Sequence, residues 1–545
     1  MGLFGGTPMR GRTLNWAITA ACCQGFLLLG YDQGTSNSSH TTRVRMSQSS
    51  TCSSLSEKPK LIRRAGVMSG LIGADNQFGR DFNSPDSKLQ GIIVSIYDIG
   101  CAVGCLFAFF FGERVGRKSM ILAGGVTMVV GTALLGSSTT LAQLLVGRIV
   151  TGVGNGFNSS TIPMYQSEMC KPQNRGILLC MQGTITIVGL CIAYWLDFGL
   201  SFVSGPVQWR FPISFQAFFA IALVLQTLPL PETPRYLIEK GRVTEASQIL
   251  ARLEMDVETA IDDDEVVFQR RQIETSLELE SAGGPFRYSE LLKGGKIQNF
   301  RRVCLCCAVN VMQQFTGANM INYYAPVVYA NTMNLSRNLS LILGGCTSLT
   351  YLAASFIPLW TVEKYGRRAL LMFSAAGLCL CFSMVSILLS IGTRSTAYAA
   401  TAFVFIFQIF LGVGWLPIPW FYPSEVTTTR IRSRGQAVGG FVNWMCVFTV
   451  VQITPIAIDS IDWHTFIIFA VFCALWVPIV YCFFPETNQL RLEDIDHLFE
   501  NGGVTGGVFS AKGGRTVEPG VHERVPDTGE KGVGDGKTVQ VEEAV

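Results

Sequence analysis

Twelve apolar stretches constrain the fold of this 545-residue chain more than any other feature of its sequence. The hydrocarbon core of a bilayer is about 30 Å thick, so a helix that crosses it needs roughly 20 apolar residues. The composition agrees, because 49% of the residues are hydrophobic and only 15% are charged. The sequence therefore predicts an all-α integral membrane protein with twelve transmembrane helices. They are expected at residues 14–34, 90–111, 119–138, 141–164, 176–199, 211–230, 303–331, 340–362, 369–391, 397–422, 436–456 and 463–484.

Composition also excludes several classes of protein. The formal net charge of +3 is too small to suggest a nucleic-acid partner. Most of the 17 cysteines lie in apolar stretches, where cysteine behaves as a small hydrophobic residue, and no C-x-x-C pair has a matching histidine. With only four histidines and no Ser-His-Asp arrangement, the chain is expected to be no enzyme and to need no metal or other cofactor. The first residues lack the pattern of a cleaved signal peptide.

The distribution of Lys and Arg sets the expected orientation. The loops after the second, fourth, eighth and tenth stretches carry several of them, whereas the loops after the third, ninth and eleventh carry almost none. Because cytoplasmic loops retain positive charge, both termini are expected in the cytoplasm of a multi-pass protein of the plasma membrane. The loop after the seventh stretch is then outside, and its sequons make Asn334 and Asn338 candidate glycan acceptors.

The two halves of the chain repeat one another. GERVGRK returns as VEKYGRR, Glu168 as Glu425, Arg175-Gly176 as Arg434-Gly435, and PETPR as PETNQ, in the same order and at nearly one spacing. Such internal repeats are typical of secondary transporters that bind their substrate near mid-membrane between the halves. The expected domains are a cytoplasmic N-terminus at 1–13, a six-helix bundle at 14–231, a cytoplasmic helical linker at 232–300, a second bundle at 301–486 and a tail at 487–545 that is disordered after about residue 500.

With these motifs the chain resembles the sugar porter family of the major facilitator superfamily, and within it the fungal hexose and related sugar transporters. The resemblance covers about residues 14–500 apart from 35–66, and GRK, PETPRYL, QQFTGANMINYY and PIPWFYPSE occur in the expected order. It implies the major facilitator fold, in which two six-helix bundles give alternating access to a monosaccharide, either a hexose or a pentose.

Acidic and basic residues occupy matching helix ends in both halves. Charge-assisted pairs between them would hold the cytoplasmic side shut and part when it opens, and the resemblance implies this gate. The simpler alternative is a set of helix-end charges that only obeys the positive-inside rule. One departure from the family is Glu113, where relatives more often carry Asp. The candidate gate residues are Glu113, Arg114, Arg117, Glu168, Arg175, Glu232, Arg235, Glu363, Arg367, Arg368, Glu425, Arg430, Arg434 and Glu486.

Uncharged amides lie inside several apolar stretches. An amide offers a donor and an acceptor together, as a sugar hydroxyl does, although buried amides also simply join membrane helices. Residues 314, 318 and 322 follow one helical face, which favours contact with a ligand. The candidate substrate-binding amides are Gln182, Gln313, Gln314, Asn319, Asn322 and Asn443.

PIPW at 417–420 places two prolines inside an apolar stretch and predicts a kink or a break there. The resemblance implies that Trp420 lines the sugar site and that Tyr323 and Tyr324 help to close its outer side. Trp444 can serve either the pocket or the packing of the bundle. Relatives often carry Asn where this chain has Val447 and Thr347, which removes two amides from the expected pocket and leaves a polyol or quinate as an alternative substrate.

Asp32 is an acid inside the first apolar stretch. Ionisable residues in a membrane are costly and are functional candidates by default, with Arg148 as the expected partner. Proton-coupled relatives resemble this chain in having Gly-Tyr-Asp here, which implies that protonation of Asp32 couples proton and sugar movement. Some facilitative carriers share the acid, so a uniporter remains the alternative.

A sugar sensor that signals through its tail is the alternative from another class, but the tail after residue 500 is short. The expected partners are a sugar, protons and the lipid bilayer, and the chain is expected to act as a monomer. The sequence leaves the sugar and its affinity open.

Residues 35–66 interrupt the family pattern. They are rich in serine and in Lys and Arg, and at mid-membrane their backbone and charges would be unsatisfied. VMSGLI at 67–72 supplies the continuation that the family has directly after GYDQG. We interpret 35–66 as a retained intron of the gene model, and a genuine extruded loop is the alternative.

Overall fold

The computed structural model describes residues 9–35, 78, 81–82, 87–170, 175–254, 261–281, 284, 286–294, 298–327, 329, 337–488, 499, 505 and 508. Every regular element within these residues is helical, as the sequence predicts. Residues 36–66 of the suspected intron, Asn334 and nearly all of the tail lie outside the described residues, and Asn338 lies in a described helix.

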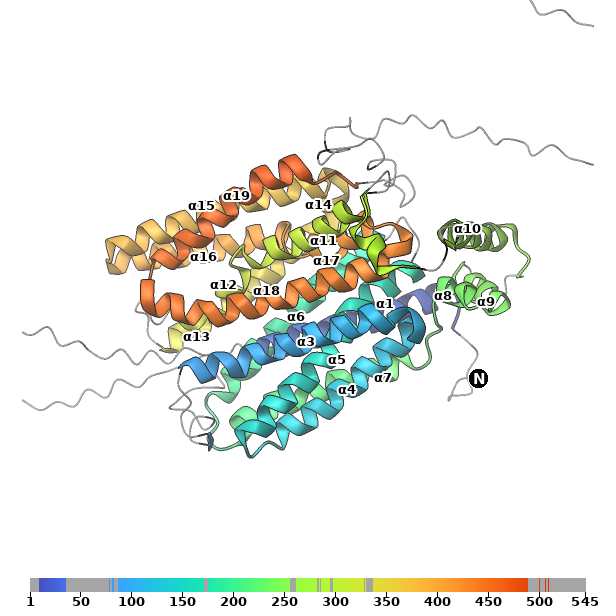
Figure 1. Cartoon of the computed structure of the whole chain (residues 1–545). Helices are drawn as coiled ribbons and strands as arrows, with labels where there is room; N and C mark the ends of the chain where they lie inside the picture. Colours follow the sequence, from blue (N-terminus) through green and yellow to red (C-terminus); the bar gives the residue numbers. More distant parts are fainter. Residues whose placement is uncertain are drawn as a thin grey trace, which may run out of the picture. The chain divides into compact units, whose positions relative to one another are not determined.

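Six long helices form the first half of the described chain. α3 and α4 pack against α5, α1 packs against α6, and α7 packs against α4 and α1 (Figure 1). These helices are α1 Gly11–Thr35, α3 Ser87–Val115, α4 Arg117–Gly136, α5 Leu141–Met169, α6 Arg175–Leu200 and α7 Val207–Thr227.

The second half has more helices because several of them are broken. α15 packs against α16 and α19, α11 packs against α18, and α13 packs against α16. The helices are α11 Asn299–Gln314, α12 Ala318–Val327, α13 Arg337–Ser355, α14 Pro358–Tyr365, α15 Arg367–Ile391, α16 Arg394–Val413, α17 Ile418–Val426, α18 Arg432–Ile461 and α19 His464–Phe483.

The linker between the halves is helical, as expected. It contains α8 Pro234–Glu239, α9 Val243–Glu254, α10 Asp264–Ser281 and the 3-10 turn η2 Tyr288–Leu292. A second 3-10 turn, η4, spans Thr429–Ile431 and precedes α18. We call the end of the bundles at which these linker helices lie the linker end.

Nine helices of the described chain are long and apolar enough to cross a membrane, or ten if the bent pair α13 and α14 forms one span. The remaining two expected spans are α5 and the broken pair α11 and α12. α5 is buried along most of its length, so it can carry Arg148, Asn155 and Asn158 without exposing them to lipid. Its lower hydropathy therefore follows from its place inside the bundle.

Two pairs of consecutive helices, α11–α12 and α16–α17, are each separated by a short non-helical break, and the residues that cause the break differ between the two. Gly317 has φ of 77°, which favours glycine, and it separates α11 from α12. α16 ends at Val413 and α17 begins at Ile418, so the break predicted at PIPW is confirmed. Both breaks leave non-helical backbone beside the space between the two bundles.

α3 and α5 approach each other closely. A Cβ on Gly152 would lie 2.3 Å from the Tyr97 carbonyl oxygen, and one on Gly156 would lie 2.2 Å from that of Cys101. Small residues permit such contact between membrane helices. The close packing holds Arg148 of α5 beside α3.

Candidate functional site

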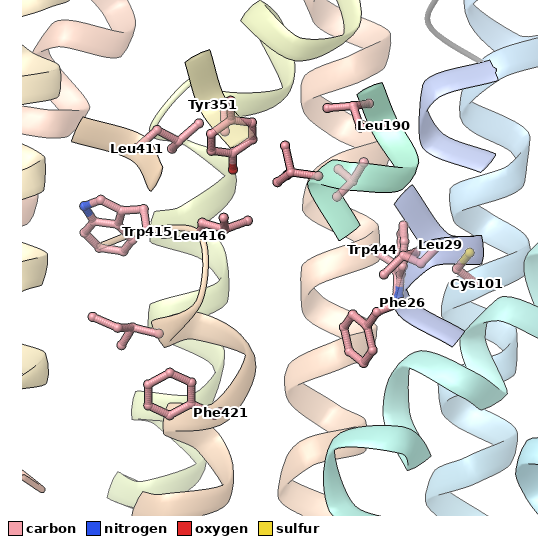
Figure 2. Packing of buried hydrophobic residues seen from close by; sticks show 14 of the residues in the cluster. Phe26, Leu29, Cys101, Leu190, Tyr351, Leu411, Trp415, Leu416, Phe421 and Trp444 are labelled. Atoms are coloured by element: carbon pink, nitrogen blue, oxygen red, sulfur yellow. The ribbon is translucent and has the colours of Figure 1, made fainter. Parts of the chain in front are cut away.

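A cavity lies between the two halves, and its empty space, counted together with the part open to solvent, is about 670 Å³. Figure 2 shows Tyr351, Leu411 and Leu416 on one side of this space and Leu29 and Leu190 on the other. Six of the seven predicted substrate-binding residues line it: Gln313, Gln314, Asn319, Asn322, Trp420 and Asn443.

Gln182, the seventh, lines a smaller neighbouring cavity of about 340 Å³. The two cavities share Thr186, Leu416 and Trp420 as lining residues. The predicted residues therefore gather around one region between the halves.

The amides of the larger cavity are hydrogen-bonded to one another. Gln314 Nε2 donates to Asn443 Oδ1 at 2.6 Å, and Asn319 Nδ2 donates to Gln314 Oε1 at 2.6 Å. Gln313 Nε2 donates to the Trp415 carbonyl at 2.8 Å. The network joins α11, α12 and α18, and an entering hydroxyl group can exchange with its donors and acceptors.

Asn322 is held from two other helices. Gln408 Nε2 of α16 donates to Asn322 Oδ1 at 2.7 Å, and the Tyr194 hydroxyl of α6 donates to the Asn322 carbonyl. Tyr194 belongs to the first half and Asn322 to the second. This contact therefore links the two halves on one side of the cavity.

The aromatic residues divide between the cavity wall and the packing of the bundles. Trp420 lines the cavity and meets the edge of Phe26, with ring centroids 6.0 Å apart. Trp444 is fully buried and donates to Ser159 Oγ at 3.3 Å, so it packs the interface between the halves. Its edge meets Tyr97 with centroids 6.1 Å apart.

The two missing amides have different consequences. Val447 lines the cavity and gives it an apolar surface, as expected. The Thr347 hydroxyl is 2.8 Å from the Tyr329 hydroxyl and Thr347 does not line either cavity, so the expectation that it alters the pocket is wrong. A position in sequence does not reveal toward which neighbour a helical side chain points.

Asp32 and Arg148 lie together, as predicted. Arg148 Nη1 is 3.9 Å from Asp32 Oδ1, and both residues are buried. Gln216 Nε2 of α7 donates to Asp32 Oδ1 at 2.5 Å, and Arg148 Nε donates to the Ile93 carbonyl at 3.2 Å. The Arg148 guanidinium lies over the Tyr97 ring, with its central carbon 5.5 Å from the ring centroid. These contacts connect α1, α3, α5 and α7.

At the linker end the two halves repeat one arrangement. Arg117 Nη2 is 3.2 Å from Glu168 Oε1 in the first half, and Arg367 Nη2 is 2.9 Å from Glu425 Oε1 in the second. Glu363 Oε1 also contacts Arg367 Nη2, at 3.1 Å. Both arginines are buried, so the pairs are shielded from solvent.

Two further glutamates cap matching helices. Glu232 accepts the backbone N–H groups of Arg117 and Lys118 at 3.1 Å. Glu486 accepts those of Arg367 at 2.9 Å and of Arg368 at 3.0 Å. A carboxylate at a helix N-terminus is favoured by the exposed N–H groups and by the helix dipole.

Most of these pairs lie within one half, but a pair of Arg434 and Glu113 joins the halves. Arg434 Nη2 of α18 donates to Glu113 Oε2 of α3. The Arg434 guanidinium also lies 3.5 Å from the centroid of the Phe286 ring in the linker. The pair of Arg434 and Glu113 therefore ties the second half to the first at the linker end.

The other candidate gate residues make different contacts. Arg430 Nε contacts Glu290 Oε2 of the linker at 2.8 Å, and this hydrogen bond holds the pKa of Glu290 below its usual range. Arg368 donates to the Val508 carbonyl at 2.9 Å and to that of Tyr481. The Arg114 carbonyl accepts from Tyr236 at 3.0 Å.

Arg235 interacts electrostatically with Glu168. The side chains of Arg175, Tyr323 and Tyr324 lie outside the described residues. Their expected roles therefore remain predictions.

Comparison with known proteins decides the family. The family model described as "Sugar (and other) transporter" matches residues 16–499. The chain belongs to this sugar transporter family. It is therefore a multi-pass membrane transporter of the major facilitator superfamily. The expected fold class is confirmed.

Several relatives of this transporter are fungal. It is 37% identical to the MFS-type transporter oryC of Aspergillus oryzae, over 91% of this chain and 87% of that protein. It is 34% identical to the sugar transporter STL1 of Saccharomyces cerevisiae, over 90% of this chain and 82% of that protein. It is 30% identical to the high-affinity glucose transporter 1 of Candida albicans, over 79% of this chain and 82% of that protein.

Its fold is similar to that of solved structures of XylE. The proton:xylose symporter XylE bound to 6-bromo-6-deoxy-D-glucose has a TM-score of 0.72 at 20% identity, over 89% of this chain and 99% of that one. The inward-open conformation of XylE from E. coli has a TM-score of 0.63 at 19% identity, over 89% and 100%.

Sequence reasoning missed four residues of the transporter's central region. Gln33 and Tyr351 line the cavity, Gln408 holds Asn322, and Asp98 is fully buried on α3. The rule that selected the other amides, a polar residue inside an apolar stretch, also applies to Gln408 and Asp98. For Tyr351 the sequence offers no such signal.

Proposed function

We propose that this transporter carries a monosaccharide, a hexose or a pentose, by alternating access and in symport with protons. The observation that carries the proposal is the cavity between the halves, which is lined by hydrogen-bonded amides and by Trp420. Amides match the paired donor and acceptor of each sugar hydroxyl, and an aromatic face suits the C–H side of the ring. The substrates named for STL1, for the Candida glucose transporter and for XylE belong to the same class.

The cavity disfavours an anionic substrate. The residues that line it, as far as the chain is described, include no Lys, Arg or His. A carboxylate such as quinate would lose its hydration there without gaining a cationic partner, which is costly. A polyol is the remaining second candidate, because Val447 gives the cavity one apolar patch in place of an amide.

Alternating access follows from contacts on both sides of the cavity. The pair of Arg434 and Glu113 closes the linker end, and the contact of Tyr194 with Asn322 joins the halves beside the cavity. Sugar hydroxyls that replace the bond of Gln314 to Asn443 change how α11 is held to α18. We assign the remaining charged pairs at the linker end to the same cytoplasmic gate.

Proton coupling involves Asp32 and Arg148. When Asp32 is ionised, the guanidinium and the Gln216 amide stabilise its charge. Protonation removes that charge and with it the attraction to Arg148, so α1 and α5 lose one of their ties. Because Gln33 on the same turn of α1 lines the sugar cavity, a shift of α1 reaches the substrate.

The proposal includes the topology and the chain boundaries. The linker end is cytoplasmic, both termini are cytoplasmic, and the protein acts as a monomer in the plasma membrane. The bundles span 14–231 and 301–486, and residues 35–66 are a retained intron. Sequencing of the mature mRNA across this segment tests the last point, and a transcript that keeps it would refute the intron.

Counterflow into proteoliposomes tests the substrate class. Purified protein is assayed with labelled D-glucose, D-xylose, sorbitol, glycerol and quinate, and we expect exchange of at least one monosaccharide. Asn443→Ala should weaken that exchange, whereas Gln166→Ala should not, because Gln166 is a buried amide of α5 that bonds to Thr19 and is not among the lining residues of either cavity. Exchange of quinate alone, or of no tested compound by folded protein, would contradict the proposal.

A further inference from the structure

Asp98 is a buried acid of α3 to which the proposed mechanism gives no task. Its relative exposure is 0%, and neither of its carboxylate oxygens has a hydrogen-bond partner in the described part of the chain. An ionised carboxylate in such a place is costly unless it is paired. An unpartnered acid that is fully buried in a membrane bundle therefore points to a function or to bound protons.

Asp98 lies beside the proton site. Its carboxyl interacts electrostatically with Arg148 of α5 and with Asp32 of α1. From its own helix, Tyr97 precedes it in sequence and the Cys101 thiol interacts with it. α18 and α4, which also pack against α3, contribute no titratable group that interacts with Asp98 among the described residues.

One guanidinium thus faces two carboxyl groups. Arg148 can neutralise one negative charge, so two ionised acids would leave a net negative charge in the bundle. The contacts favour Asp32 as the ionised one, because Gln216 donates to it at 2.5 Å and Arg148 lies 3.9 Å away. Asp98 receives no such donor, which is the arrangement expected of a neutral, protonated carboxyl.

We propose that Asp98 is a second proton-binding carboxyl of the coupling site and exchanges its proton with Asp32. In the state described here Asp98 carries the proton and Asp32 is the carboxylate. Transfer of one proton leaves Asp98 as the carboxylate and Asp32 as the neutral acid, with no change in total charge. Arg148 then pairs with α3 instead of α1.

The packing of α3 gives this exchange a consequence. Ser95 Oγ donates to Gln452 Oε1 at 2.9 Å, and Tyr97 meets Trp444, so α3 contacts α18 of the other half. α18 also carries Asn443 of the sugar cavity. Movement of Arg148 from α1 toward α3 therefore connects the proton to the interface that alternating access must rearrange. The transport role of Asp98 rests on the proposed proton symport.

Infrared spectroscopy of the purified full-length protein tests protonation directly. With ¹³C-labelled aspartate, the carbonyl stretch of a protonated aspartic acid is expected at neutral pH in the wild type. Asp197 is also buried with neither carboxylate oxygen bonded in the described chain, so it can hold a proton for the same reason, and Asp197→Asn serves as the reference in which it cannot contribute to the band. The band should persist in Asp197→Asn and disappear in the double variant Asp98→Asn/Asp197→Asn. An Asp197→Asn spectrum without this band, or a band that survives in the folded double variant, would overturn the proposal.

Accumulation in proteoliposomes tests the transport role. A gradient of one pH unit drives about tenfold accumulation of a substrate that is coupled to one proton. With labelled D-glucose and D-xylose as probes, we expect this in the wild type and in Asp197→Asn, and little or none in Asp98→Asn. If the wild type transports but ignores the gradient, symport fails, and the infrared result still decides whether Asp98 holds a proton. Gradient-driven accumulation by Asp98→Asn equal to that of the wild type would refute its part in coupling.

Discussion

Removal of the charge pair that joins the two halves should open the linker end. The Arg434 side chain is 13% exposed and that of Glu113 is 30% exposed, so the pair lies between a surface pair and a buried one. Exposed pairs contribute about 0.2–1 kcal/mol, whereas loss of one partner of a buried pair costs about 3–5 kcal/mol. We therefore expect Glu113→Gln to shift the equilibrium between the closed and the open linker end toward the open state by about 1–2 kcal/mol, which is roughly 5-fold to 30-fold.

A double-mutant cycle isolates this pair from its surroundings. Arg434 also stacks on Phe286, so Arg434→Gln alone removes more than the ion pair. The coupling energy of Glu113→Gln with Arg434→Gln should equal most of the effect of Glu113→Gln alone. The exposed pair of Arg242 and Glu245 in the linker is the matched control, and its removal should leave the equilibrium unchanged.

Distances across the linker end report the equilibrium. Spin labels on genetically encoded ketone residues at Val115 and Tyr365, both exposed and in different halves, avoid the native cysteines. The distance distribution should gain a longer component in Glu113→Gln. An unchanged distribution, or strictly additive effects in the double mutant, would refute the account of this gate.

Three further changes test other parts of the structure. Arg430 lowers the pKa of Glu290, so their contact stabilises the folded protein at pH values above the ordinary carboxyl range. This stabilisation is lost as the pH falls through the lowered pKa. Glu290→Gln should therefore reduce the pH dependence of the melting temperature in acid. Gly156→Val should lower the melting temperature, because its Cβ would meet the backbone of α3 and overpacking costs about 1–3 kcal/mol. Gly199→Ala is the control and should leave the melting temperature unchanged, because nothing lies within 4 Å of an added Cβ there. Val447→Asn adds an amide to the cavity and should tighten hexose binding relative to polyol binding in a competition assay, and an unchanged ratio would contradict the assigned lining.

The sequence identified the amides of the cavity because of a simple physical conflict. Gln313, Gln314, Asn319 and Asn443 are polar residues in apolar stretches, and such residues must meet a ligand or one another. The structure shows that they meet one another in a network. All four also line the cavity, and their places there depend on helix breaks at Gly317 and near Pro417, whose geometry the sequence indicates only in part.

Other residues depend on contacts that no local pattern contains. Thr347 sits in an apolar stretch like the amides, but its hydroxyl lies beside that of Tyr329, 18 residues earlier in the chain. Asp98 is visible as an acid in a span, yet its place beside Arg148 and Asp32 depends on the close approach of α3 and α5. The span expected at 141–164 is α5, and the bundle shields the polar residues that lower its hydropathy.

Gradient-driven uptake by the wild-type protein and by Asp32→Asn tests the central claim most directly. In proteoliposomes with an imposed pH gradient, the wild type should accumulate a labelled monosaccharide, and a protonophore should abolish the accumulation. Asp32→Asn should fail to accumulate it, since its side chain stays neutral beside Arg148 and cannot bind and release a proton. Wild-type uptake that ignores both the gradient and the protonophore, or full accumulation by Asp32→Asn, would contradict proton-coupled sugar transport.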